Sequence, residues 1–182
     1  MNAILRHLQQ QRPFDTVAEE VFVGLQLAAN RLMEPWARYL RETADLTEVQ
    51  YNVLRILRGA GPDGVRVQEL GCRLITRSPD VTRLIDRLER SSLVSRRPDP
   101  GDGRAVRVHI TDTGLERLIP LDNRARELLG KHLGRMDEER LSVLSGLLGE
   151  VLDAVRDGCA AVDSRTGGGQ DAVPDKGERF DG

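Results

Sequence analysis

Arginines dominate one stretch of the 182-residue chain, residues 66–107. Ten arginines there oppose six acidic residues, a net charge of +4, whereas the whole chain carries −2 and the remainder therefore −6. A guanidinium group can donate two parallel hydrogen bonds to a phosphate, or to O6 and N7 of guanine. A basic segment in an acidic protein is typical of nucleic-acid binding. We therefore predict that this segment contacts double-stranded DNA.

Other chemistry is poorly supported by the residue types and their spacing. Cys72 and Cys159 are far apart and form no C-x-x-C pair, so neither a zinc motif nor a disulfide framework is predicted. His7, His109 and His132 lack the spacing of metal ligands. No phosphate-cradling glycine loop and no nucleophile with a recognisable base is present. We therefore predict that the protein is not an enzyme and uses no cofactor or metal.

Residues 80–90 have the period of an amphipathic helix. Apolar residues recur at i, i+3, i+4 and i+7, namely Val81, Leu84, Ile85 and Leu88. Ser78 followed by Pro79 is a start signal, with a capping side chain and then a residue suited to the first turn. Asp80 adds a negative charge near the positive end of the helix dipole. A helix capped by Ser78 is therefore predicted.

The polar side of this helix has two interpretations. Arg83, Arg87 and Arg90 follow one another at i, i+4 and i+7. In the first interpretation they form a solvated surface with local pairs such as Asp80–Arg83 and Asp86–Arg90, each contributing about 0.2–0.5 kcal/mol. In the second they contact DNA, and the neighbouring elements favour this second interpretation.

The segment upstream predicts a helix-turn-helix. Residues 67–74 carry a short apolar stripe, which indicates a two-turn helix, and Gly71 would let another helix approach it closely. Only a few residues, 75–77, connect it to the next helix. Two short helices with a tight connection are typical of the motif whose second helix enters the major groove.

The segment downstream predicts a hairpin. Val94 begins a short strand, and residues 104–110 alternate, with one face formed by Val106, Val108 and Ile110 and the other by Arg107 and His109. Residues 98–103 (PDPGDG) form a dense turn signal between the two strands. A hairpin directly after a helix-turn-helix makes a winged helix.

Residues 46–118 resemble the MarR family of winged-helix transcription regulators. The matching segments are LTEVQYNVLRIL (46–57), VQELGCRL (67–74), DVTRLIDRLER (80–90), LVSRRPDPGDGRAVRVHIT (93–111) and Gly114. The most characteristic feature is Asp-x-Arg at the wing tip, here Asp102 and Arg104. The family commonly has an arginine between these two residues, where this chain has Gly103. Arg104 therefore either takes over a minor-groove contact or pairs with Asp102 and holds the wing rigid.

The resemblance implies a mainly α fold with a small β-hairpin wing, flanked by dimerisation helices. It implies a homodimer whose recognition helices lie about one DNA turn apart on a palindromic operator. We expect a sequence-specific regulator, a repressor rather than an activator. The residues expected to face base edges or nearby phosphates are Arg77, Ser78, Asp80, Thr82 and Arg83. The other expected DNA-binding residues are Arg87, Arg96, Arg97, Asp102, Arg104 and Arg107, of which Arg96, Arg97, Arg104 and Arg107 serve the wing and the phosphate backbone.

Four regions are predicted along the chain. They are an N-terminal dimerisation helix region (residues 1–45), the winged helix-turn-helix domain (46–111), C-terminal dimerisation helices (112–162) and a disordered tail (163–182). In the first region, an amphipathic helix over 15–42 contains Pro35, which should kink or break it. Thr47 and Gln50 form a capping box, and residues 58–65 are predicted as a loop. Thr111 caps a helix to about residue 130, and Asp137 opens the last helix.

The last predicted helix carries a wide apolar stripe that needs a partner, within the chain or in a second subunit. Its first members are Leu144, Leu148, Val151 and Val155. No run of about 18 apolar residues exists, so no membrane span is predicted. The N-terminal residues lack the apolar region of a secretory signal, and a cytoplasmic location is expected.

Three further hypotheses remain open. Many MarR-family members release DNA when an aromatic compound binds between the dimer helices and the winged module. The candidates for contacting such a compound here are Trp36, Tyr39 and Tyr51. Aromatic residues at this spacing also suit a hydrophobic core or a protein interface. Cys72 is either an oxidation sensor next to DNA or a small side chain at a partly buried position. The acidic remainder and Gly103 leave a protein–protein module without specific DNA binding as an alternative.

Overall fold

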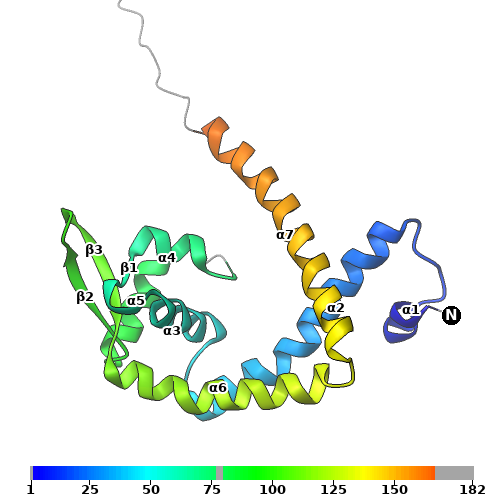
Figure 1. Ribbon diagram of the computed structural model, residues 1–182, viewed down its shortest axis with the longest axis horizontal. Coiled ribbons are helices and arrows are strands. Elements are labelled where there is room, and N and C mark those ends of the chain that lie inside the picture. Colours follow the sequence, from blue (N-terminus) through cyan, green and yellow to red (C-terminus); the bar gives the residue numbers. More distant parts are fainter. Residues whose placement is uncertain (1, 77–79, 167–182) are drawn as a thin grey trace, which may run out of the picture. The chain divides into compact units, whose positions relative to one another are not determined.

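The computed structural model describes residues 2–76 and 80–166, with only the backbone described for Gly103 and residues 156–166. Contacts divide the chain into two compact units, residues 1–132 and 133–182, which are treated separately below. The elements of the first unit are shown in Figure 1. Its helices are α1 (Ala3–Leu8), α2 (Val17–Tyr39), α3 (Glu48–Ala60), α4 (Val67–Arg73), α5 (Val81–Arg90) and α6 (Asp112–Leu133). Its strands are β1 (Val65–Arg66), β2 (Val94–Asp99) and β3 (Asp102–Ile110).

These elements give the predicted fold class, mainly helical with a small sheet. The sheet is antiparallel in the order β1-β3-β2, and β2 and β3 form the wing. Helices α3, α4 and α5 lie beside it (Figure 1). The core between them is formed by side chains with at most 1% exposure, among them Leu54, Leu57, Leu70, Ile85, Leu88, Val108 and Leu118. Each such side chain contributes roughly 1.5–3 kcal/mol through burial, so this core fixes α5 against the sheet.

The N-terminal region contains more structure than the sequence indicated. A short helix, α1, precedes α2, and a π-helical turn, η1 (Leu40–Ala44), continues α2. Pro35 lies inside α2 without interrupting it, so the predicted break is wrong. The two residues after Pro35, Trp36 and Ala37, are the buried residues of α2.

Helix α3 begins as predicted and ends later than predicted. The Thr47–Gln50 capping box is present, with Thr47 N–H donating to Gln50 Oε1 over 2.8 Å. The loop predicted over 58–65 is wrong, because α3 runs to Ala60, a 3-10 turn η2 (Gly61–Asp63) follows, and Val65 begins strand β1. A two-residue strand is too short to show a period in the sequence.

The helix-turn-helix is formed by α4 and α5. A Cβ added at Gly71 would lie 3.4 Å from Val81 Cγ2, an ordinary van der Waals contact, so α5 packs beside Gly71 without an approach that only glycine would allow. Helix α5 begins at Val81 and is capped by Asp80, whose Oδ1 accepts from Arg83 N–H over 2.9 Å. The predicted cap by Ser78 is therefore wrong, and residues 77–79 lie outside the described part of the chain.

The wing strands are longer than predicted. Pro98 and Asp99 belong to β2 and Asp102 to β3, so the turn predicted over 98–103 is shorter than expected. The register is irregular between Pro98 and Asp99. After the wing, Thr111 Oγ1 accepts from Gly114 N–H over 3.0 Å, the predicted cap. A Cβ at Gly114 would come within 2.2 Å of Leu93 O, so only glycine fits where α6 meets the sheet.

The second unit contains helix α7 (Glu138–Thr166). Asp137 caps it, with Oδ1 accepting from Arg140 N–H over 2.8 Å. The helix includes the first residues of the segment predicted as a tail; residues 167–182 lie outside the described part. Its apolar stripe is exposed, as shown by Val143, Leu147, Leu152 and Val155. None of the described helices has the length and apolar character needed to span a membrane.

Candidate nucleic-acid interface and ligand cavity

The outer face of α5 presents side chains that can reach a groove. Thr82, Arg83 and Arg87 are exposed. Arg83 Nε lies 3.0 Å from Asp80 Oδ2, as predicted, yet 79% of the Arg83 side chain remains exposed. The Asp80 carboxylate also caps the helix, so its position is explained by α5 itself. The predicted residues Arg77 and Ser78 lie outside the described part of the chain.

Arg96 on β2 binds the inner side of α5. Its Nη2 lies 2.6 Å from Asp86 Oδ1, and its Nη1 lies 2.5 Å from Glu89 Oε2. Asp86 therefore pairs across elements, rather than with Arg90 as the helical spacing suggested. Nη2 also donates to Thr82 O over 3.3 Å. Although burial lowers the pKa of Arg96, the bonds to Asp86 and Glu89 raise it overall. These contacts join the wing to the recognition helix.

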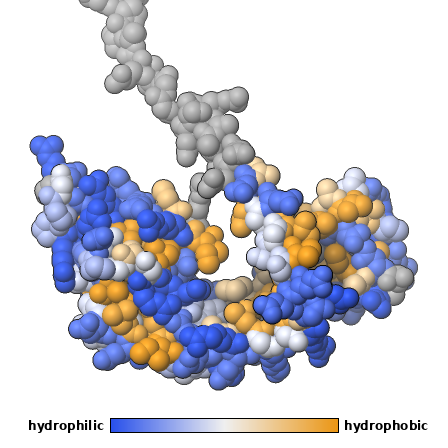
Figure 2. All heavy atoms as spheres, in the orientation of Figure 1, coloured by the Kyte–Doolittle hydropathy of each residue, from blue (hydrophilic) through white to orange (hydrophobic). Residues whose placement is uncertain are grey.

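Arg97 and Arg104 extend from the wing into solvent. Both side chains are exposed, and the wing surface is hydrophilic (Figure 2). Arg104 N–H donates to Asp102 Oδ1 over 3.1 Å, so the Asp-x-Arg signature forms a backbone turn. Among the described residues, no carboxylate forms an ion pair with the Arg104 guanidinium. Of the two roles considered for Arg104, this geometry favours an outward contact.

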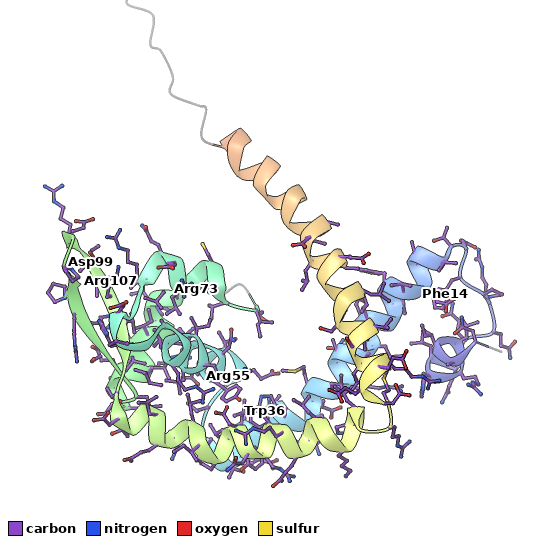
Figure 3. The ribbon with its side chains drawn as sticks, viewed as in Figure 1. Phe14, Trp36, Arg55, Arg73, Asp99 and Arg107 are labelled. Carbon is purple, nitrogen blue, oxygen red and sulfur yellow. The ribbon has the colours of Figure 1, made fainter. Side chains whose placement is uncertain are left out.

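Arg107 on β3 lies close to Asp99, which ends β2 toward the tip of the wing (Figure 3). Arg107 Nε is 2.6 Å from Asp99 Oδ2, and its Nη1 donates to Asp63 O and Gly64 O over 3.1 and 3.3 Å. Arg66 on β1 binds the same carboxylate. The bonds from Arg66, and then those from Gly101 N–H and Arg107, hold the pKa of Asp99 far below its usual range despite burial. Sequence reasoning missed Arg66 and read Asp99 only as a turn residue.

A cavity of about 660 Å³ lies within the first unit, between α2, α3 and α6. Trp36 and Tyr51 line it, whereas Tyr39 does not. Tyr39 instead stacks on Trp36, with ring centroids 5.8 Å apart, and Trp36 meets Tyr51 edge to face at 4.9 Å. Trp36 approaches the cavity from α2 and Arg55 from α3 (Figure 3). Two of the three predicted aromatic residues are therefore brought to one site.

The cavity wall contains polar residues that sequence reasoning did not select. Arg55 and Asn52 belong to it, and Asn52 Oδ1 accepts from Ile75 N–H over 3.1 Å. Tyr51 donates its hydroxyl hydrogen to Asp122 Oδ1 over 2.9 Å, and Arg58 forms an ion pair with Asp122. Burial, followed by this hydrogen bond, raises the pKa of Tyr51 to about 12.

Comparison with known proteins identifies the family. The MarR family model matches residues 46–106. The chain is 42% identical over 75 residues to the uncharacterized regulator YkoM of Bacillus subtilis, covering 40% of this chain and 47% of that protein's length. It is 32% identical over 113 residues to the transcriptional repressor NicR of Pseudomonas putida, covering 60% of this chain and 68% of NicR. The chain belongs to the MarR family.

Solved structures agree with this assignment. The MarR-family regulator Sco3205 of Streptomyces coelicolor, in complex with DNA, superposes with a TM-score of 0.69 at 26% identity, covering 78% of this chain and 94% of that chain. The regulator PcaV of the same organism, in complex with its natural ligand, gives 0.62 at 26% identity, covering 80% and 99%. As a MarR-family member, the protein is a DNA-binding transcriptional regulator, not an enzyme.

The cysteine on the helix-turn-helix of this MarR-family protein is exposed, so its predicted partial burial is wrong. Leu70 and Leu74 fill the buried side of α4 and its end, and Cys72, between them, points away from the core. Cys159 lies in the part of α7 whose side chains are not described. Within the described residues, no group of three or more His, Cys, Asp or Glu side chains could hold a metal ion.

Proposed function

We propose that the protein acts as a homodimer that binds a palindromic operator and represses transcription, and that a small aromatic effector releases it from DNA. The observation that carries the proposal is the set of exposed arginines on α5 and the wing, outside the internal ion pairs. In this proposal, residues 1–45 and 112–162 supply the dimerisation helices, and residues 46–111 form the DNA-binding domain. The repressor assignment draws on NicR, a repressor by name.

Dimerisation is supported by apolar side chains left exposed in both units. In α2 these include Val17 and Phe22, which are 77% and 61% exposed, and in α7 they include Leu152, which is 68% exposed. On α7, the exposed residues Leu144, Leu148, Val151 and Val155 follow one another at helical spacing, and an apolar stripe of this kind marks an interface. A two-fold dimer then places two copies of α5 in successive major grooves, which requires a palindromic site.

The proposed DNA contacts follow from exposure. The Arg83 side chain is 79% exposed although it pairs with Asp80, and no acid among the described residues forms an ion pair with Arg87, Arg97 or Arg104. Thr82, Arg83 and Arg87 would enter the major groove from α5, while Arg97 and Arg104 would contact phosphates or the minor groove from the wing. Arg77 and Ser78 remain candidates beside them. We assign the other sequence-derived candidates, Asp80, Arg96, Asp102 and Arg107, to holding these contacts in place, because their polar groups are already bonded within the domain.

Specific binding is tested with a duplex spanning the region upstream of the protein's own gene, against a scrambled duplex of equal length, by fluorescence anisotropy. Arg83→Ala is expected to weaken binding to the upstream duplex more than to the scrambled one, because a base contact carries sequence information. Arg126→Ala on α6, also an exposed arginine, is the matched control and should change neither. Equal losses on both duplexes would reduce Arg83 to a phosphate contact. No preference by the wild-type protein would favour the protein–protein module.

The effector proposal rests on the cavity beside Trp36 and Tyr51, and on the bound ligand of PcaV. Arg55 at the wall gives the cavity a positive group, which favours aromatic carboxylates. Benzoate and hydroxybenzoates should raise the melting temperature and release the DNA, because a ligand that binds the folded state stabilises it. Arg55→Ala should weaken both effects, with Arg126→Ala as control. A melting temperature unchanged by every acid in the series would reject the aromatic carboxylate.

The exposure of Cys72 favours a thiol switch as the second candidate mechanism. Oxidation of a side chain on α4 would add a bulky polar group next to the DNA-binding helix. Peroxide would then release the DNA from the wild-type protein but not from Cys72→Ser. Equal release from both proteins removes this mechanism and leaves the cavity as the site of control.

A further inference from the structure

Asp99 is the most heavily bonded carboxylate of the winged module. It lies where β2 and β3 lose their regular register, and only 2% of its side chain is exposed. Arg66 donates from Nε to Oδ2 over 2.8 Å and from Nη2 to Oδ1 over 3.0 Å. Arg107 donates from Nε to Oδ2 over 2.6 Å. Two arginines from two different strands therefore converge on one buried acid; Figure 3 labels Asp99 and one of them, Arg107.

The same carboxylate also holds the backbone of the wing tip. Asp99 Oδ1 accepts from Gly101 N–H over 2.8 Å and from Asp102 N–H over 3.1 Å. Asp102 in turn accepts from Arg104 N–H over 3.1 Å. A continuous series of hydrogen bonds thus runs from Asp99 through Asp102 to the backbone of Arg104.

The two arginines connect this wing tip to the helix-turn-helix. Arg66 is the residue from which α4 begins, and it has extended backbone geometry at that cap. Arg107 donates to the carbonyls of Asp63 and Gly64, in the connection between α3 and β1. Contacts through Asp99 therefore link the wing tip to the start of α4 and to the connection before β1, while Arg96 separately links β2 to α5.

We propose that Asp99 is a positioning residue for DNA binding, which fixes the wing tip through Arg66 and Arg107 so that the Arg104 guanidinium is aimed at its groove. This inference rests on the proposed DNA contact of Arg104. The physical reason is preorganisation: an unrestrained tip would lose backbone and side-chain freedom on binding, at a cost to affinity. With Asp99 in place, that freedom is already lost in the folded protein.

A merely structural role makes a different prediction. If Asp99 only supported the fold, its loss would weaken DNA binding by the same factor whether or not Arg104 was present. If Asp99 only neutralised Arg66 and Arg107, its loss would release two cations and tighten binding. If Asp99 acts through Arg104, substituting Asp99 should not change the DNA affinity of a variant that already lacks the Arg104 side chain.

The test is a double-mutant cycle with the full chain and the upstream duplex, measured by anisotropy at fixed salt. Asp99→Asn is expected to lower the affinity about tenfold in the wild-type background, and less than about twofold in the Arg104→Ala background. Asp86→Asn is the matched control, because it makes the same charge change in another arginine-bound acid of the module. Its effect should be the same in both backgrounds.

Two results overturn the inference while leaving the wing contact intact. One is an equal factor for Asp99→Asn in both backgrounds, and the other is tighter binding by Asp99→Asn. If Arg104→Ala itself leaves the affinity unchanged, the proposed wing contact fails, and the inference fails with it. Should Asp99→Asn not fold, judged by circular dichroism, Arg66→Ala replaces it in the same cycle. That variant removes a half-exposed partner and retains the Arg107 pair.

Discussion

Seven of the ten arginines of the basic segment fall into two sets with different surroundings. Of the other three, Arg73 and Arg83 pair with an acid three or four residues before them, and Arg77 lies outside the described part of the chain. The partnered set binds carboxylates on neighbouring elements and consists of Arg66, Arg96 and Arg107. The unpaired set forms no ion pair with any acid in the described part of the chain and consists of Arg87, Arg90, Arg97 and Arg104. Each arginine of either set adds the same unit charge to the net charge of +4 that the sequence shows. The difference teaches that a charge count overstates how much of a basic surface is available to DNA.

The two sets should therefore affect different measurements. A guanidinium bonded to acids across elements stabilises the geometry of the domain, so its loss should appear in the free energy of unfolding. An exposed guanidinium without a partner contributes little to stability but can neutralise a phosphate or bond to a base. Substitutions in adjacent residues of opposite sets make this separation measurable.

Arg96→Ala should show the largest effect. Its guanidinium bridges Asp86 and Glu89 and is only 26% exposed, so we expect the variant to lose about 2 kcal/mol of unfolding free energy, in the range for hydrogen bonds to charged groups. Urea denaturation measures this loss. The control is the neighbouring exposed residue, Arg97→Ala, which should stay within about 0.5 kcal/mol of wild type. Equal losses of unfolding free energy in the two variants would show that partnered and unpaired arginines do not differ in their contribution to stability.

Arg104→Ala should reverse this pattern. The side chain is exposed on the wing and its backbone turn with Asp102 does not need the guanidinium, so stability should be unchanged. Affinity for the upstream duplex should fall about tenfold, as for loss of one good groove contact. Anisotropy titration measures the affinity, and urea denaturation of the same sample gives the stability. A stability loss with unchanged affinity would place Arg104 in the partnered set.

The sequence indicated the elements of this module better than the roles of its arginines. The apolar period of α5 and the alternation of β3 are local, and both elements form, although α5 is capped by Asp80 and β3 begins two residues earlier than predicted. Arg96 and Arg97 are adjacent, and alternation along β2 places them on opposite faces of the strand. Which face lies against α5 depends on packing between segments, so the sequence alone could not assign one arginine to acids and the other to solvent.

Other differences between the predicted and the observed structure arise where two residues could each fill the same role, or where a partner lies on a strand that was not predicted. Ser78 and Asp80 are both good caps, and the helix begins after the second of them. Trp36 and Tyr51 line the cavity, whereas Tyr39 stacks on Trp36. Helical spacing alone does not predict which of these aromatic side chains reaches the cavity. The importance of Asp99 was hidden because one of its two arginine partners, Arg66, comes from β1, a strand that was not predicted.

Salt dependence gives a finer comparison of the two sets. The logarithm of affinity for B-DNA falls with the logarithm of salt concentration, with a slope near −0.9 per neutralised phosphate. Arg97→Ala should make the slope shallower by about 0.9 if the exposed side chain neutralises one phosphate. Arg107→Ala should leave the slope unchanged, because its guanidinium is bound to Asp99 and backbone carbonyls. Titrations over a salt series with both variants measure the slopes, and a shallower slope for Arg107→Ala would contradict the division.

Arg58 extends the comparison beyond the basic segment, because it shares Asp122 with the Tyr51 hydroxyl. Tyr51→Phe should lose about 1 kcal/mol of unfolding free energy at neutral pH, as for one hydrogen bond. The pKa of Tyr51 is raised from its ordinary value of 10.0 to about 12 in the folded protein. A raised folded pKa contributes stability that is fully present below pH 10 and is lost as the pH rises toward 12. Urea denaturation at pH 8 and pH 11 should therefore show the two proteins converging as the pH rises. A constant difference would mean that the hydroxyl proton does not contribute to this network, and that Arg58 alone holds Asp122 in place.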